Sequence, residues 1–234
     1  MLDGGQITVC WHVDDLKISH RDEAIVSEFA MALAKEFGPK TTISRGKVHD
    51  YLGMDLNLGT CPGTMIISVI RYLQKVIDEF PEVLRSTKVC PAGDNLFKVR
   101  EDEDRELLSK EMAKKFHCTV AQLLFLCKRA RPDIKTLVFF LTTRVRQPDK
   151  DDWGKLRHGL MYLKGTLHMK KYVTVDNLSN IVWWVDGSFG VHWDSRGHTV
   201  AMISMVNGAI VNIARKTQDE CGEFNRVGIG AYCC

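Results

Sequence analysis

The sequence lacks the features of a membrane or secreted protein. None of its apolar runs reaches eighteen residues, and residues 1–6 lack the basic and apolar regions of a signal peptide. Its eight cysteines include no C-x-x-C pair and have no neighbouring histidine pair at zinc-binding spacing. We therefore expect an intracellular protein with no membrane partner, whose cysteines are reduced thiols, many of them buried.

The apolar content is sufficient for folded domains, and the charge is unevenly distributed. The chain has 234 residues, 45% of them hydrophobic, so it can hold one large or two small domains. The net charge of the whole chain is +3. Residues 110–171 carry 15 Lys and Arg against 5 Asp and Glu, whereas the rest of the chain carries 17 Lys and Arg against 24 Asp and Glu. This basic segment includes Lys128, Arg129, Arg131, Lys135, Arg144, Arg146, Lys155, Arg157, Lys164, Lys170 and Lys171. The pattern favours amphipathic helices with one cationic face for phosphate backbone, or equally a solvated helical surface.

The most informative stretch is residues 7–18, where an apolar alternation is interrupted by Asp14 and Asp15. Apolar residues at every second position on both sides predict a hairpin with the acid pair at its tip. Aspartate is common in surface turns, so a plain turn is one interpretation. The other is a divalent-metal site, because two exposed carboxylates on a rigid tip suit Mg²⁺.

Strand-rich stretches and a long helical stretch are separate along the remaining chain, and we expect an α+β fold. The predicted helices cover residues 22–37, 70–80, 116–130, 134–146 and 151–163. The predicted strands cover residues 48–58, 65–69, 181–186, 198–206 and 209–214, with a hairpin turn at Asn207-Gly208. Residues 81–97 are expected to be irregular, and the acidic run 101–106 is the first turn of a helix or a solvated linker.

Two features near the end of the chain are candidates for chemistry. Asp186 is placed where the first of the last three predicted strands ends, and it is either an ordinary strand-end aspartate or a metal ligand. His192 and His198 flank the following loop. Because no further ligand is paired with them, we interpret these histidines as satisfied loop residues rather than as a metal site.

Five short motifs follow one another along the chain. They are His12-Val13-Asp14-Asp15-Leu16, Asp50-Tyr51-Leu52-Gly53-Met54-Asp55-Leu56, Arg129-Ala130-Arg131-Pro132-Asp133-Ile134, Tyr162-Leu163-Lys164-Gly165-Thr166 and Trp184-Val185-Asp186-Gly187-Ser188-Phe189. In this order they resemble motifs of copia-type retrotransposon polyproteins, in which a reverse transcriptase is followed by ribonuclease H. The first is similar to the family's Tyr-Val-Asp-Asp-Leu catalytic hairpin, with His in place of Tyr. The resemblance runs from about residue 6 to residue 218.

The resemblance implies three parts. These are a partial reverse-transcriptase palm with the primer grip over 1–100, a basic helical thumb or connection over 101–172, and an incomplete ribonuclease H-like mixed sheet over 173–234. It also implies two-metal phosphoryl transfer with Mg²⁺, or alternatively Mn²⁺, acting on an RNA template, a DNA primer and an RNA/DNA hybrid. Remaining polyprotein segments are further expected partners, and the expected location is a cytoplasmic particle or the nucleus.

The resemblance assigns roles to individual residues. Asp14 would bind the metals of the polymerase site with support from Asp15, and Asp186 would hold a metal for hydrolysis of RNA in a hybrid. The residues expected to contact the primer or other nucleic acid are Tyr51, Leu52, Gly53, Met54, Lys128, Arg129, Arg131 and Lys164.

The sequence departs from the family pattern at two places. The family's further palm carboxylate lies upstream of the hairpin, on a strand that we do not find here. After Gln218, the chain lacks the family's Ser-Ser-Thr-Glu-x-Glu-Leu motif, which carries the second ribonuclease H carboxylate. Reading the codons for residues 223–230 one nucleotide later permits that motif, so we hypothesise a frameshift between about Gln218 and Gly222, which the coding DNA tests. We also expect an exposed apolar face on the last strands.

Two alternatives to an enzyme fragment stay open. One is a non-catalytic nucleic-acid-binding remnant of a degenerate element, and the other is an unexpressed or unfolded fragment. A cooperative melt distinguishes the second from a folded protein.

The first prediction concerns polymerase activity. We expect the purified chain alone not to extend a primer on an RNA template with Mg²⁺, because one palm carboxylate is missing from the expected site. A primer-extension assay measures this, and template-dependent incorporation would contradict the prediction.

Overall fold

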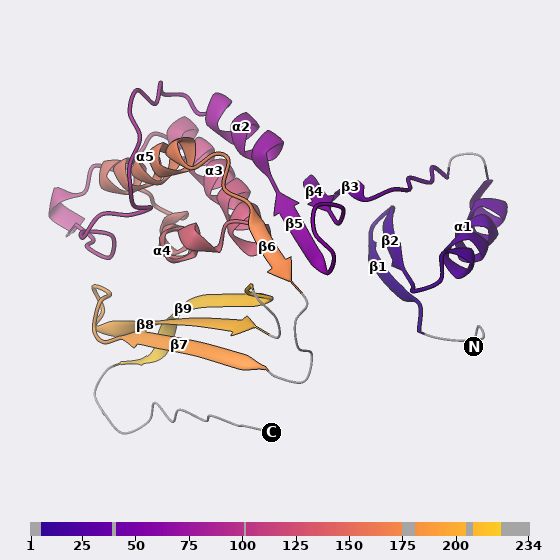
Figure 1. Ribbon diagram of the computed structural model, residues 1–234. Helices are drawn as coiled ribbons and strands as arrows, with labels where there is room; N and C mark the ends of the chain where they lie inside the picture. Colours follow the sequence, from indigo (N-terminus) through magenta and orange to yellow (C-terminus); the bar gives the residue numbers. More distant parts are fainter. Residues whose placement is uncertain (1–5, 39–40, 101, 175–180, 205–207, 221–234) are drawn as a thin grey trace.

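The computed structural model describes residues 6–38, 41–100, 102–174, 181–204 and 208–220 (Figure 1). The helices are α1 (Glu23–Phe37), α2 (Ile70–Asp78), α3 (Lys110–Arg129), α4 (Lys135–Arg144) and α5 (Lys150–Gly165), with 3₁₀ turns η2 (Asp102–Asp104) and η3 (Pro132–Ile134). The strands are β1 (Thr8–His12), β2 (Asp15–Ser19), β3 (Val48–Tyr51), β4 (Met54–Asn57), β5 (Thr64–Ser68), β6 (Lys171–Thr174), β7 (Val182–Ser188), β8 (Arg196–Ser204) and β9 (Val211–Glu220). The predicted α+β class is confirmed.

Three antiparallel sheets organise these strands. Their orders are β1-β2, β3-β4-β5-β6 and β7-β8-β9. The prediction of a mixed sheet at the carboxyl-terminal end is therefore wrong for the described strands, which form an antiparallel meander there. The predicted turn residue Asn207 lies outside the described residues.

The second sheet differs from the prediction at both ends. Residues 48–58 form two strands rather than one, because Leu52 and Gly53 adopt φ of 54° and 71° and reverse the chain in a tight turn. Strand β6 was not predicted, and it pairs with β5 from more than a hundred residues further along the chain, Thr64 facing Thr174. A strand of four residues has too short a pattern to identify it from sequence.

The helix ends follow local capping chemistry. Asp22 accepts a hydrogen bond from the Ala24 amide at 2.8 Å at the start of α1, and Gly38, at φ 76°, ends that helix. Helix α3 begins six residues earlier than predicted, because Ser109 accepts from the Met112 amide at 3.3 Å. The acidic run contains the separate short turn η2 instead of the first turn of α3.

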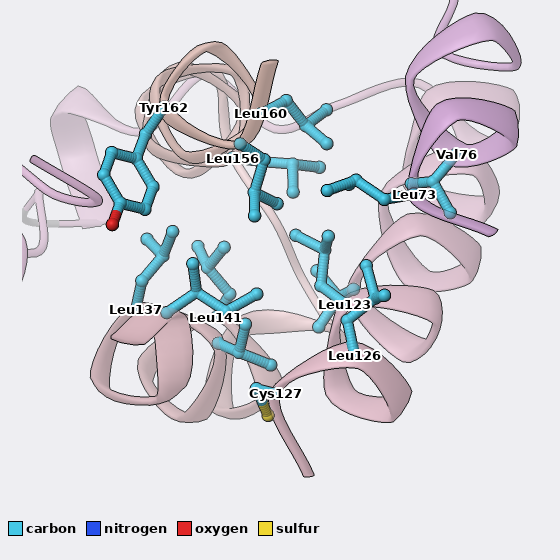
Figure 2. Close-up of a cluster of buried hydrophobic side chains, with 14 of the residues drawn as sticks. Leu73, Val76, Leu123, Leu126, Cys127, Leu137, Leu141, Leu156, Leu160 and Tyr162 are labelled. Carbon is cyan, nitrogen blue, oxygen red and sulfur yellow. The ribbon is translucent and has the colours of Figure 1, made fainter. Parts of the chain in front are cut away.

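The largest core lies among α2, α3, α4 and α5, where apolar side chains from four helices meet (Figure 2). Leu123 of α3, Leu141 of α4 and Leu160 of α5 have no exposed surface. Fully burying such a side chain stabilises the fold by about 1.5–3 kcal/mol. Met54 and Leu56 extend the same core onto β4, so the helices and the second sheet share one apolar interior.

The third sheet contacts the helical core through a limited area. Ala214 of β9 and His198 of β8 are buried, and β9 contacts α4. Strand β7 lies at the sheet edge, and its Trp183, Trp184 and Val185 are 58–59% exposed. The expected exposed apolar face on the last strands is thus confirmed for the described residues.

Two further expectations concern cysteines and membranes. The expectation of many buried cysteines is wrong, because four of the five described cysteines are exposed and only Cys127 is buried. All five are free thiols. Among the described residues, no helix combines the length and apolar character needed to cross a bilayer.

Two glycines of α5 provide a matched test of the core. A Cβ on Gly159 would lie 2.2 Å from Cδ2 of the buried Leu137, whereas nothing lies within 4 Å of a Cβ on Gly154. We expect Gly159→Ala to lower the free energy of unfolding, since overpacking costs about 1–3 kcal/mol. Gly154→Ala should raise it by about 0.5–1 kcal/mol through helix propensity alone. Urea unfolding measures both, and equal stability of the two variants would contradict this packing.

Candidate nucleic-acid and metal site

The predicted acid-pair hairpin is present, with a two-residue turn. His12 of β1 faces Asp15 of β2, so Val13 and Asp14 form the turn and Asp15 begins the second strand. Val13 has φ 52°, an unusual conformation for a β-branched residue. The Trp11 indole N–H donates to the Val13 carbonyl at 2.5 Å and so supports this conformation.

Both carboxylates of this hairpin are available to a ligand. Asp14 and Asp15 are exposed, and within the described part of the chain neither side chain has a hydrogen bond or an ion pair. No cluster of three or more His, Cys, Asp or Glu side chains occurs among the described residues. The protein side chains thus offer one or two oxygen ligands here, which fits the usual binding of Mg²⁺ together with substrate phosphates.

The predicted primer-contacting hairpin lies against the first sheet. The Tyr51 hydroxyl, at the end of β3, donates to the Cys10 carbonyl of β1 at 3.2 Å. Leu52 and Gly53 form the turn between β3 and β4, while Met54 is buried in the core. The structure therefore brings Tyr51 to the acid-pair hairpin, and it gives Met54 a packing role.

A cross-strand ion network holds the second hairpin. Arg71 of α2 donates to Asp50 at 2.8 Å and also to Asp55, one carboxylate on each of β3 and β4. The hydrogen bond with Asp55, followed by that with Asp50, raises the pKa of Arg71. This contact links α2 to the strands that flank the Leu52-Gly53 turn.

Three of the four predicted basic residues are at least partly accessible. Lys128 is exposed near the end of α3, and Arg129 is half-buried with its guanidinium 5.3 Å from the centre of the Phe125 ring. Lys164 is exposed near the end of α5, and its ammonium donates to the Leu84 carbonyl at 2.5 Å. These residues offer positive charge at the carboxyl-terminal ends of two helices.

The fourth predicted residue, Arg131, is enclosed. Its side chain is 1% exposed, and its guanidinium donates to Asp133 at 2.8 Å and to the Thr166 carbonyl at 3.0 Å. The structure therefore gives Arg131 an internal pairing role and leaves its guanidinium no exposed surface for the predicted contact with nucleic acid. The neighbouring Lys135 is also buried, and desolvation lowers its pKa.

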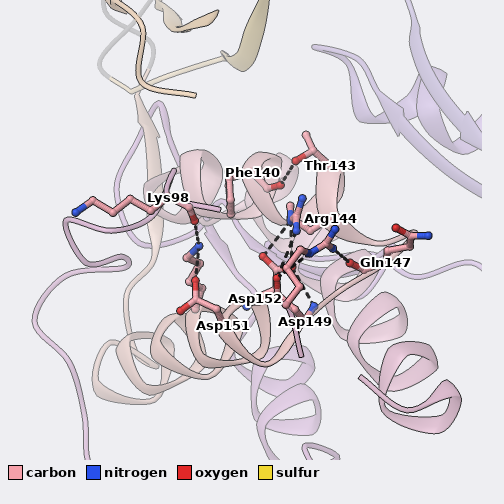
Figure 3. A network of polar contacts seen from close by, with 10 residues as sticks. Lys98, Phe140, Thr143, Arg144, Gln147, Asp149, Asp151 and Asp152 are labelled. Atoms are coloured by element: carbon pink, nitrogen blue, oxygen red, sulfur yellow. Dashed lines mark hydrogen bonds and ion pairs between the residues drawn. The ribbon is translucent and has the colours of Figure 1, made fainter. Parts of the chain in front are cut away.

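Other residues of the basic segment point inward as well (Figure 3). Arg144 pairs with Asp152 at 3.0 Å and with Asp149 at 3.5 Å, while Lys155 pairs with Asp151 at 2.9 Å. Asp149 and Asp152 also form the capping box of α5. Burial raises the pKa of Asp152, although Arg144 opposes that shift. The cationic face is thus smaller than the number of basic residues predicts.

The third predicted metal position lies in a different sheet. Asp186 is exposed on β7 opposite Val200, inside a strand that continues to Ser188 rather than at a strand end. Figure 1 shows the β7-β8-β9 sheet and the β1-β2 hairpin on different sides of the molecule. Asp186 and Asp14 therefore do not form one site.

Sequence reasoning missed the strongest polar cluster of the third sheet. His192 and His198, interpreted above as satisfied loop residues, are both buried and lie 3.1 Å apart, from Nε2 of His192 to Nδ1 of His198. The tight turn that contains Ser195, at φ 60°, folds one histidine back onto the other. Their spacing in sequence carries no signal of this contact.

Comparison with known proteins shows similarity to proteins of transposable elements. The chain is 27% identical over 217 residues to a transposon Ty5-1 protein of Saccharomyces cerevisiae, covering 91% of this chain and 66% of that protein. It is 20% identical over 207 residues to an uncharacterised mitochondrial protein of Arabidopsis thaliana, and this alignment covers 88% of this chain and 82% of that protein. It is 24% identical over 162 residues to the retrovirus-related Pol polyprotein of transposon TNT 1-94 from Nicotiana tabacum, and this alignment covers 68% of this chain and 12% of that polyprotein.

These similarities support a retrotransposon polyprotein as the class of protein, at low identity. The aligned region spans 66% of the yeast protein and a small part of the tobacco polyprotein. No known family profile and no solved structure matches the chain significantly.

Substitutions of the buried Arg131 and the exposed Lys128 should have different effects on stability. We expect Arg131→Met to lower the free energy of unfolding by about 3 kcal/mol, because it breaks a buried ion pair, leaving Asp133 with only the Tyr162 hydroxyl and the Thr166 carbonyl without its guanidinium donor. Lys128→Met, on the exposed surface, should change it by less than about 0.5 kcal/mol. Urea unfolding followed by circular dichroism measures the difference, and a similar small effect for both would disprove the assignment of Arg131.

Proposed function

We propose that this chain is the carboxyl-terminal part of a copia-type reverse transcriptase followed by the first strands of its ribonuclease H domain. The observation that carries the proposal is the exposed Asp14-Asp15 pair on a tight β-hairpin, in a chain similar to retrotransposon proteins. The motif order described above supports the same assignment. The proposed chemistry is phosphoryl transfer assisted by two metal ions.

The hairpin residues would hold the metal, and the second hairpin would place the primer. Asp14 and Asp15 supply oxygen ligands at a tip that is exposed to nucleic acid. Bound Mg²⁺ would polarise the primer hydroxyl and neutralise the nucleotide phosphates. Tyr51, through its hydrogen bond to Cys10, sets the position of the primer-contacting turn relative to this tip.

The nucleic-acid backbone would be bound by the accessible cations of the helical part. Lys128, Arg129 and Lys164 are the predicted residues that retain accessible positive charge. Binding through such residues neutralises phosphates and releases counterions, so it weakens as salt increases. Other segments of the polyprotein would complete the polymerase site and the nuclease site around Asp186.

A second candidate function is nucleic-acid binding without catalysis. It is favoured by the isolation of the candidate acids, since no cluster of three or more metal-ligating side chains lies within the described residues. This candidate keeps the cationic helices and gives the acid pair no metal. The two proposals therefore differ at Asp14 and Asp15.

Metal-directed cleavage of bound nucleic acid tests the metal site without requiring polymerisation. In the assay, Fe²⁺ replaces Mg²⁺ on the chain bound to a primed RNA/DNA hybrid, and peroxide then generates hydroxyl radicals at the metal. We expect cleavage within a few nucleotides of the primer 3′ end, and its loss in Asp14→Asn, because that carboxylate holds the ion. Asp78→Asn, which removes an exposed acid of α2, is the matched control and should cleave normally.

The outcomes separate the two functions. Hybrid binding without localised cleavage supports the non-catalytic binding protein. Cleavage that persists in Asp14→Asn contradicts the proposed metal site, and absence of hybrid binding contradicts both functions.

The binding surface gives a separate prediction. We expect Lys128→Ala to weaken hybrid binding and to reduce the slope of log K against log salt by about one unit, since one phosphate contact is lost. Lys35→Ala removes an equal charge from the exposed surface of α1 and should leave the slope unchanged. Fluorescence anisotropy at several salt concentrations measures the slopes, and equal effects of the two variants would argue against a specific helical surface.

A further inference from the structure

His192 and His198 form the polar centre of the junction between the third sheet and the helical core. Their rings pack on Phe97, with centroids 4.8 Å and 5.2 Å away, and His192 also stacks on Phe140 of α4 at 6.4 Å. Both histidines are at least 95% buried. The pair therefore stands between the sheet and two aromatic side chains of the preceding chain.

The contact between the two rings requires that one nitrogen carries a proton and the other does not. Nε2 of His192 and Nδ1 of His198 are 3.1 Å apart, which permits a single N–H···N hydrogen bond. Among the described residues, Nε2 of His198 has no hydrogen-bond partner. The favoured neutral arrangement has Nδ1–H of His198 donating to His192, because it leaves a lone pair rather than an unpaired N–H at that buried position.

An added proton at Nε2 of His198 has no hydrogen-bond partner among the described residues. Protonation of His198 would place an N–H at the unpartnered Nε2, and protonation of both rings would bring two donors face to face. The charges near the pair do not compensate. They are Lys216 of β9, Asp194 of the turn, Arg196 of β8 and, next to the Phe140 ring, Lys155 of α5.

The one carboxylate of this group is paired through its Oδ2 only, and its buried Oδ1 has no hydrogen-bond partner among the described residues. Asp194 pairs with Lys216 and lies 3.6 Å from Arg196, and Lys216 in turn lies 5.4 Å from the centre of the Trp193 ring. On the helical side, Lys155 is 4.9 Å from the Phe140 ring centre and is paired with Asp151. Positive charge thus surrounds the aromatic junction on both sides.

We propose that the buried His192–His198 pair makes the attachment of the β7-β8-β9 sheet to the helical core sensitive to acid. In the neutral pair the rings share one proton and pack on Phe97 and Phe140. An imidazolium is more stable in water than in this apolar junction, so acid favours release of the sheet from the helices. The proposal is independent of any catalytic role of the chain.

The direction of the effect follows from the proton affinities. Desolvation, with a contribution from Lys216, lowers the pKa of His192 to about 4, and desolvation lowers the pKa of His198. The released or unfolded state binds protons at the ordinary histidine pKa of about 6.5 and so binds more protons than the attached state. The attachment is therefore fully stable above about pH 6.5 and weakens as the pH falls from 6.5 towards 4.

Hydrogen exchange of the full chain at several pH values tests this inference. After correction for intrinsic exchange rates, we expect the amides of β8 and β9 to lose protection on the order of tenfold between pH 7 and pH 5. The amides of α5 should keep their protection over the same range, because the helical core remains folded. A β8 and β9 protection that is independent of pH would overturn the proposal.

Variants identify the groups responsible. We expect His192→Gln and His198→Gln each to reduce the pH dependence, because the amide retains hydrogen-bonding capacity and does not titrate. His117→Gln, at an exposed position of α3, is the control and should behave as the parent chain. Unchanged pH dependence in both junction variants would overturn the proposal.

A nuclear magnetic resonance titration of the histidine ring carbons keeps the test decisive if the variants fail to fold. We expect His192 and His198 to titrate below the ordinary histidine pKa of about 6.5, in the same pH range in which β9 loses protection. Titration of the pair at the ordinary histidine pKa would contradict the inference.

Discussion

Arg131 occupies the point where α3, α4 and the end of α5 converge. Its enclosed guanidinium binds Asp133 and the backbone and hydroxyl of Thr166, and the Tyr162 hydroxyl donates to the same Asp133 at 2.9 Å. A buried charge is tolerated only when its partners are in place, so this network sets the direction in which the chain leaves α5. The chain then enters β6 at Lys171, which allows β6 to pair with β5.

The second sheet connects this helical corner to the candidate polymerase residues. Strand β5, held by β6 on one side, pairs with β4 on the other, and the β3-β4 hairpin contacts β1 through Tyr51. The acid pair is thus positioned through a series of local contacts that begins at the helical core. These contacts do not position Asp186, because it lies on the edge strand of the third sheet. The two proposed metal positions, in two different sheets, are compatible with the two activities that we propose.

The third sheet is attached by a small area and exposes much of its apolar surface. Ala214 and the two histidines make the buried junction, whereas the edge strand presents Trp183, Trp184 and Val185 to solvent. Because few apolar contacts hold the sheet, the polar state of the junction has a large influence on its attachment. The protonation state of the histidine pair is therefore important for the attachment of this sheet.

The sequence by itself determined the elements whose signals are local. The acid-pair hairpin, the helix over residues 22–37 and the helices over 116–130, 134–146 and 151–163 depend on residues within a few positions of one another, so their patterns predict them. Only the tertiary structure decided which basic residues face inward, that residues 171–174 complete a sheet, and that His192 meets His198. These outcomes depend on which faces meet across long sequence separations, and burial then forces a charge such as Arg131 to find an internal partner. The same residue types on an uncovered face would have remained in water.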